Sequence, residues 1–151
     1  MAILTLNQII KGLNDTANAH NQIHSFGFGN VWEMSTSGVT DYVIMWADLE
    51  DINRGRTLTE YNFTIYILDR VDRGERNETE VLSDCARITE DVIASLRHPD
   101  WTWVVEFNSA RVQVFTERSL DMLSGCAFSI TIKTINPDDT CQIPTSTLTR
   151  F

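Results

Sequence analysis

Apolar residues recur at helical spacing in two stretches of the chain. Across 5–20 they step by three and four residues, which predicts a helix with one narrow apolar face and Thr5 as its cap. A second stripe of the same period predicts a helix over 78–97, which Pro99 ends. The two stripes consist of Leu6, Ile9, Ile10, Leu13 and Ala17, and of Val81, Cys85, Ile88, Val92 and Leu96.

The two longest strand patterns cover 58–71 and 123–135, where apolar residues alternate with Thr, Asn, Ser and Tyr. Residues 41–50 are apolar at both odd and even positions. A strand of that kind is buried on both faces, so we expect a central strand or one whose outer face a partner covers.

Shorter signals complete the pattern. Residues 24–30 predict a short strand that ends in a bend, and the polar run 51–57 predicts a turn. Residues 101–107 and 110–117 predict a hairpin with Asn108-Ser109 as its turn.

The order helix, strands, helix, strands lacks a regular β-α-β alternation. It predicts an α+β fold, in which two main helices pack on an antiparallel or mixed sheet of about five to six strands. The length of 151 residues fits a single domain over 1–135. Residues 136–151 are polar, contain proline and show no periodicity, so we expect them to form an extended C-terminal arm outside the core.

Composition and charge narrow the function classes. The formal net charge of −9 argues against a nucleic-acid reader, which needs a basic face. No run of about 18 apolar residues is present, so no membrane span is expected, and the N-terminus lacks an export pattern. Cys85, Cys126 and Cys141 are odd in number and have no metal-type spacing. Cys85 and Cys126 fall in apolar positions, which predicts small buried hydrophobes and folding in a reducing compartment.

Candidate catalytic and metal-binding residues are few. His20 and His24 have a metal-pair spacing but lack a third ligand nearby, and surface histidines at a helix end are the alternative. The carboxylates of Asp48, Glu50 and Asp51 suit a divalent ion or, alternatively, a solvated strand end. No nucleophile-elbow, phosphate-loop or dinucleotide motif is present. We therefore expect neither an enzyme nor a cofactor or metal site.

Aromatic and arginine residues point to protein contacts instead. Four Trp and seven Phe are many for one small sheet, and both Trp and Arg are enriched in interfaces. The alternatives, a large core and two solvated loops, stay open at this stage. The candidate contacts between subunits are Trp46, Arg54, Arg56, Arg70, Arg73 and Arg76, with Cys141, Ile143 and Phe151 in the arm.

The layout resembles the tail-terminator and neck-protein family of tailed bacteriophages over about residues 5–135. The resemblance rests on a strand YVIMWADLED, a strand LTEYNFTIYILDRVD, an acidic helix NETEVLSDCARITEDVIASLR and a closing strand GCAFSITIKTI, in that order. Within it, residues 48–56 resemble the variable loop that such subunits use against ring neighbours.

The resemblance implies a structural subunit of the virion, assembled in the host cytoplasm. Such subunits form a homo-oligomeric ring, a hexamer or a dodecamer, that closes the tail or joins it to the head. The implied partners are further copies of the chain and tail-tube, portal or connector proteins, and DNA passes through the lumen without specific binding. The alternative is a monomeric or dimeric acidic accessory module that binds another protein.

Overall fold

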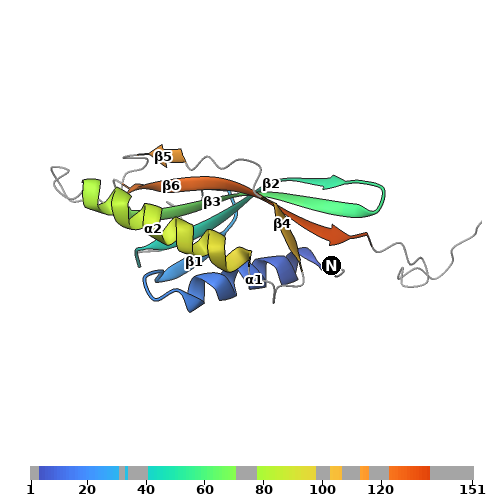
Figure 1. Ribbon diagram of the computed structural model, residues 1–151, viewed down its shortest axis with the longest axis horizontal. Helices are drawn as coiled ribbons and strands as arrows, with labels where there is room; N and C mark the ends of the chain where they lie inside the picture. The colour runs from blue at the N-terminus through green and yellow to red at the C-terminus, as the bar shows by residue number, and fades with distance from the viewer. Residues whose placement is uncertain are drawn as a thin grey trace, which may run out of the picture.

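The computed structural model describes residues 4–30, 33, 41–70, 78–97, 103–106, 113–115 and 123–136. They form an α+β fold, as expected, with a six-stranded mixed sheet and two helices (Figure 1). The elements are α1 (Leu6–Ala19), β1 (Ser25–Phe28), β2 (Ile44–Arg54), β3 (Leu58–Arg70), α2 (Glu78–Leu96), β4 (Val104–Glu106), β5 (Gln113–Phe115) and β6 (Leu123–Ile135).

The strand order is β1-β2-β3-β6-β4, with β5 also paired to β6. Only β1 and β2 run parallel, and all other pairs are antiparallel. β3 and β6 lie side by side over their full length, with Leu58 opposite Ile135 at one end and Arg70 opposite Leu123 at the other. These two long strands form the centre of the sheet.

The predicted hairpin between β4 and β5 is wrong. Both strands pair antiparallel with β6, β4 at Thr131–Lys133 and β5 at Gly125–Ala127. Two strands that are each antiparallel to a third run in the same direction, so they are not a hairpin. Local alternation identified a strand within each of the predicted ranges, 101–107 and 110–117, but it carried no information about which strand each one pairs with.

Both helices pack on one face of the sheet and form the main core with it (Figure 1). α1 begins with a capping box, in which the Thr5 hydroxyl accepts a bond from the backbone N–H of Gln8 and the Gln8 side chain accepts one from the N–H of Thr5. Every residue of the predicted α2 stripe is buried. The apolar periodicity therefore identified both helices. Neither helix of the described part is long and apolar enough to cross a membrane.

β2 is apolar on both faces, as predicted, and lies inside the sheet between β1 and β3. Met45 and Ala47 belong to the main core under the helices. Ile44 and Trp46 point to the opposite face and form a second cluster with Leu68 and Leu123. Trp46 also donates a hydrogen bond of 3.0 Å from Nε1 to the carbonyl of Gly29.

The predicted turn over 51–57 is too long. β2 continues to Arg54, and Gly55 alone separates it from the bends that lead into β3. Strand conformation persists because Asp51–Arg54 pairs with Thr59–Asn62 of β3, beyond a register shift between Leu49 and Asp51. The polar side chains there are compatible with a strand because both faces of this part are exposed to solvent.

Candidate functional site

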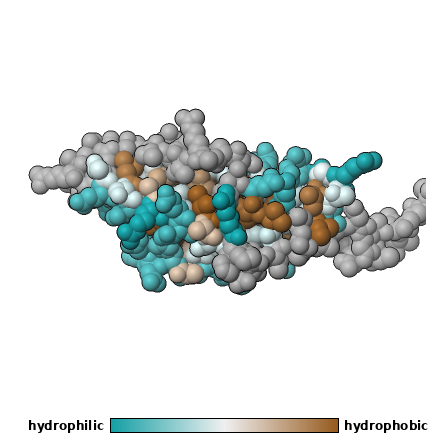
Figure 2. Space-filling view, in the orientation of Figure 1, coloured by the Kyte–Doolittle hydropathy of each residue, from teal (hydrophilic) through white to brown (hydrophobic). Residues whose placement is uncertain are grey.

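The β2–β3 hairpin projects beyond the helices at one end of the molecule (Figure 1). All residues from Asp51 to Thr57 are exposed, including Arg54 and Arg56. Ile52 is 52% exposed, the highest fraction among the large apolar residues of the described part. In Figure 2, apolar side chains reach the surface at this end of the molecule. Exposed arginine beside exposed aliphatic surface is typical of a protein contact.

The turn of this hairpin is held by Asn136, the residue after β6. Its side chain donates a hydrogen bond of 2.9 Å to the carbonyl of Gly55 and accepts one from the hydroxyl of Thr59. Its backbone N–H donates to the carbonyl of Thr57 at 3.0 Å. Asn136 is buried, although its neighbours in the turn are exposed. The tip is therefore fastened to the centre of the sheet.

The sequence-based prediction missed this role of Asn136 and placed the residue at the start of the arm. A usable signal was present: Asn136 follows a long strand and precedes a proline. Asn side chains commonly bond to the backbone of turns. The rest of the predicted arm, with Cys141, Ile143 and Phe151, lies outside the described residues.

Side chains on the face opposite the helices connect the strands at the base of the hairpin. Thr131 of β6 donates to Asn62 of β3 at 2.5 Å, and Asn62 donates in turn to the carboxylate of Asp51. Thr64 donates to Glu50 at 2.9 Å. The carboxylates of Glu50 and Asp51 thus accept hydrogen bonds from the neighbouring strand. The described residues contain no group of three potential metal ligands.

Lys133 adds an ionic connection on the same face. Its ammonium lies 2.9 Å from Glu106 of β4 and 3.6 Å from Glu60 of β3. The hydrogen bond to Glu106 is the main cause that raises the pKa of Lys133. Exposed ion pairs contribute little stability, so the three side chains chiefly define the local arrangement of β3, β6 and β4.

The end of the molecule opposite the hairpin is acidic. Among the side chains that the structure describes there, three are carboxylates, those of Asp69, Glu80 and Asp84, and one is an arginine, Arg70. Burial, with a smaller contribution from nearby Asp84, raises the pKa of Asp69. Glu80 and Asp84 are exposed on α2, and Arg70 is exposed where β3 ends. Arg73 and Arg76 lie outside the described residues. Arg70 lies far from Arg54 and Arg56, because the full length of β3 separates it from the hairpin tip.

Trp46 was predicted to contact a neighbouring subunit, but in the described structure it is buried inside the subunit. The side chain is 4% exposed and packs within the second apolar cluster. Its Nε1–H bonds to the carbonyl of Gly29, so the polar atom of the ring is also engaged inside the subunit. The residue is part of the fold because Gly27 and Gly29, far from it in sequence, provide the space and the acceptor.

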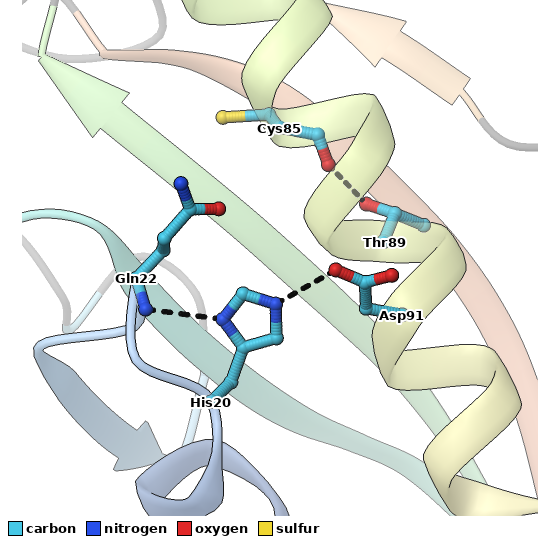
Figure 3. A network of polar contacts seen from close by, with 5 residues as sticks. All are labelled: His20, Gln22, Cys85, Thr89 and Asp91. Atoms are coloured by element: carbon cyan, nitrogen blue, oxygen red, sulfur yellow. Dashed lines mark hydrogen bonds and ion pairs between the residues drawn. The ribbon is translucent and has the colours of Figure 1, made fainter.

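His20 connects the end of α1 to α2 (Figure 3). Its Nε2 lies 2.9 Å from the carboxylate of Asp91, and its Nδ1 accepts a hydrogen bond of 3.1 Å from the N–H of Gln22. A ring that accepts at Nδ1 and carries its proton on Nε2 satisfies both contacts. His20 is thus a contact between helices, and His24, which is exposed, takes no part in it.

Cys85 and Cys126 are buried free thiols, as the sequence indicated. Burial is the main cause that raises the pKa of Cys85 to about 12, with smaller contributions from Asp69, Cys126 and Asp84. Burial also raises the pKa of Cys126. In α2, the hydroxyl of Thr89 donates to the Cys85 carbonyl at 2.8 Å (Figure 3). Thiols with raised pKa values are poor nucleophiles, which argues for packing roles.

Comparisons with known protein families and with curated proteins find no match to this chain. The candidate site therefore rests on the geometry of the chain itself. Its main feature is the projecting β2–β3 hairpin, whose tip is anchored by the hydrogen bonds of Asn136.

Proposed function

We propose that this chain is a structural subunit of a tailed-phage virion that assembles with further copies of itself into a ring at the tail end or neck. The observation that carries the proposal is the β2–β3 hairpin. Its tip extends into solvent on both faces, presents Arg54, Arg56 and Ile52, and is anchored by Asn136. An element of this kind adds nothing to the subunit's own core, and its exposed position suits a contact outside the subunit.

Anchoring of the tip favours such a contact energetically. A loop that is ordered before it binds loses less conformational entropy on association. The side-chain bonds of Asn136 to Gly55 and Thr59 provide this order in the single subunit. The resemblance in element order to tail-terminator and neck proteins gives the proposal its class, because such subunits place this segment against ring neighbours.

The remaining parts of the proposal follow from the same resemblance to tail-terminator and neck proteins. The partners are further copies in a hexamer or dodecamer and the adjoining tube, portal or connector proteins. The formal charge of −9 suits a lumen through which DNA passes, because carboxylates repel phosphates. The protein has no catalytic role in this proposal.

Native mass measurement, followed by negative-stain imaging of the same sample, tests the proposal. The expected result is a closed ring of several copies with a central hole, formed alone or after addition of tail or portal components. A chain that stays monomeric with each of those components contradicts the proposal and favours the accessory binding module. The matched variant is Arg54→Glu with Arg56→Glu, which is expected to remain folded and to lose ring formation.

A further inference from the structure

The β2–β3 hairpin and the beginning of α2 lie at opposite ends of the long axis of the molecule (Figure 1). β3 runs between these ends, from Leu58 beside the tip to Arg70. Thirteen strand residues span about 40 Å at the usual rise per residue. A side chain at the tip therefore cannot reach the beginning of α2 in the same copy.

The extreme tip of the hairpin and the opposite end of the molecule differ in the charged side chains that they present. The tip segment 52–59 contains two arginines and no acidic residue. At the opposite end, the charged side chains that the structure describes between positions 69 and 84 are three carboxylates, Asp69, Glu80 and Asp84, and one arginine, Arg70. Burial is the main cause that raises the pKa of Asp69, and repulsion by the nearby carboxylate of Asp84 raises it further. A cation placed there relieves that repulsion.

We infer that the hairpin tip of one copy docks against the acidic end of a second copy, with Arg54 and Arg56 facing Glu80 and Asp84. This inference rests on the proposed function and names the surface that receives the hairpin. The contact joins two different surfaces of the same chain, so it is heterologous and propagates from copy to copy. A closed ring results when the rotation between successive copies closes on itself.

A second copy is a better occupant than a nucleic acid. The tip offers only two arginines, whereas the whole chain carries a formal charge of −9 that repels phosphates at longer range. Arg54, Arg56, Glu80 and Asp84 are all exposed, and arginine forms paired hydrogen bonds with carboxylates. Ile52, half-exposed beside the arginines, adds apolar area to the contact.

Charge exchange tests the inference. We expect Arg54→Glu/Arg56→Glu and, separately, Glu80→Arg/Asp84→Arg to lower the assembled fraction at least tenfold at low ionic strength. The variant with all four changes restores assembly to within about threefold of the original chain. Lys11→Glu/Arg97→Glu, which changes the net charge as much as the tip variant, leaves assembly unchanged. Thermal unfolding confirms that each variant is folded.

The outcomes separate this inference from the proposed function. Rings that persist in the tip variant, or a folded fourfold variant that stays dissociated, overturn the docking surface and leave the ring itself established. An original chain that never assembles rejects the proposed function. A tip variant that still assembles but loses affinity for DNA assigns the arginines to nucleic acid and overturns the docking surface.

Cross-linking gives an independent measurement that does not depend on charge. Arg56→Cys and Glu80→Cys, each in a Cys141→Ser background, are mixed and oxidised. The inference expects disulfide-linked dimers in the mixture and none in either variant alone. Absence of linked dimers from an assembled mixture places the tip elsewhere and overturns the inference.

Discussion

The backbone of Gly27 lies under the indole ring of Trp46, its register partner on the neighbouring strand. A methyl group added to Gly27 would lie 2.2 Å from Cζ3 of that ring, well inside van der Waals contact. The glycine is therefore required by the ring, and the ring is held by its bond to the Gly29 carbonyl. Together the two residues close the second apolar cluster on the β1 side.

Gly27→Ala is expected to destabilise the protein by about 1–3 kcal/mol, because the buried ring has little space into which to move. In a Trp46→Leu background the same change should cost much less, since the clash is removed. Urea unfolding of the four proteins measures this coupling. Equal costs of Gly27→Ala in both backgrounds would show that the steric account is wrong.

Asn136→Ala is expected to loosen the hairpin tip. It removes the bonds to Gly55 and Thr59 and leaves the carbonyl of Gly55 without its side-chain donor. The expected cost is about 1–3 kcal/mol of unfolding free energy. Hydrogen exchange should also quicken at the Gly55 amide, which bonds to the carbonyl of Leu58. Asn53→Ala, an exposed change on the same hairpin, is expected to stay within about 0.5 kcal/mol.

The contact between His20 and Asp91 is expected to need a hydrogen-bond acceptor rather than a charge. Asp91→Asn keeps an oxygen that accepts from Nε2–H, so it should retain most of the stability that Asp91→Ala loses, about 0.5–1.5 kcal/mol. Nitrogen NMR of the imidazole checks the geometry directly and should show the proton on Nε2. A proton on Nδ1 in the neutral ring is incompatible with the bond from the Gln22 N–H.

The buried thiols are expected to resist alkylation in the folded protein. Since the pKa of Cys85 is raised to about 12, the thiolate fraction of Cys85 at pH 8 falls roughly 10³-fold below that of an ordinary thiol. A Cys141→Ser variant limits the measurement to Cys85 and Cys126. Both should react promptly in denaturant and only at the rate of unfolding without it. Fast labelling of the native variant would contradict the burial of these thiols.

Asp69→Asn is expected to stabilise the protein at neutral pH. The folded-state pKa of Asp69 lies above the ordinary value of 3.8, so the ionised carboxylate opposes folding. This cost is absent below the unfolded pKa and develops as the pH rises through the folded one. The advantage of Asn over Asp should therefore shrink as the pH falls toward 3.8. Unfolding midpoints of both proteins across this range check the direction.

The helices and the long strands could be predicted from the sequence because their burial follows a single period. The stripe from Val81 to Leu96 is buried throughout, and β6 was predicted with the bounds that it has. In β2, Met45 and Ala47 lie under the helices while Ile44 and Trp46 fill the other face. The spacing of apolar residues along the sequence was sufficient wherever burial in the core determines the secondary structure.

Features that depend on a distant partner could not be predicted in this way. The strand continues to Arg54 because β3 pairs with it, although the side chains there are polar. Trp46 becomes buried because Gly27, nineteen positions earlier, lacks a side chain.

The central pair of strands has a consequence for the order in which the chain folds. β3 and β6 are neighbours in the sheet, yet α2, β4 and β5 lie between them in the sequence. Contacts of such long sequence separation require closure of a large loop. The entropy cost of this closure precedes the stabilising contacts and slows folding. Until Leu123–Ile135 has been synthesised, Phe63, Ile65 and Ile67 lack the strand that completes their layer. The core therefore cannot be completed until β6, the last strand to be synthesised, has paired with β3.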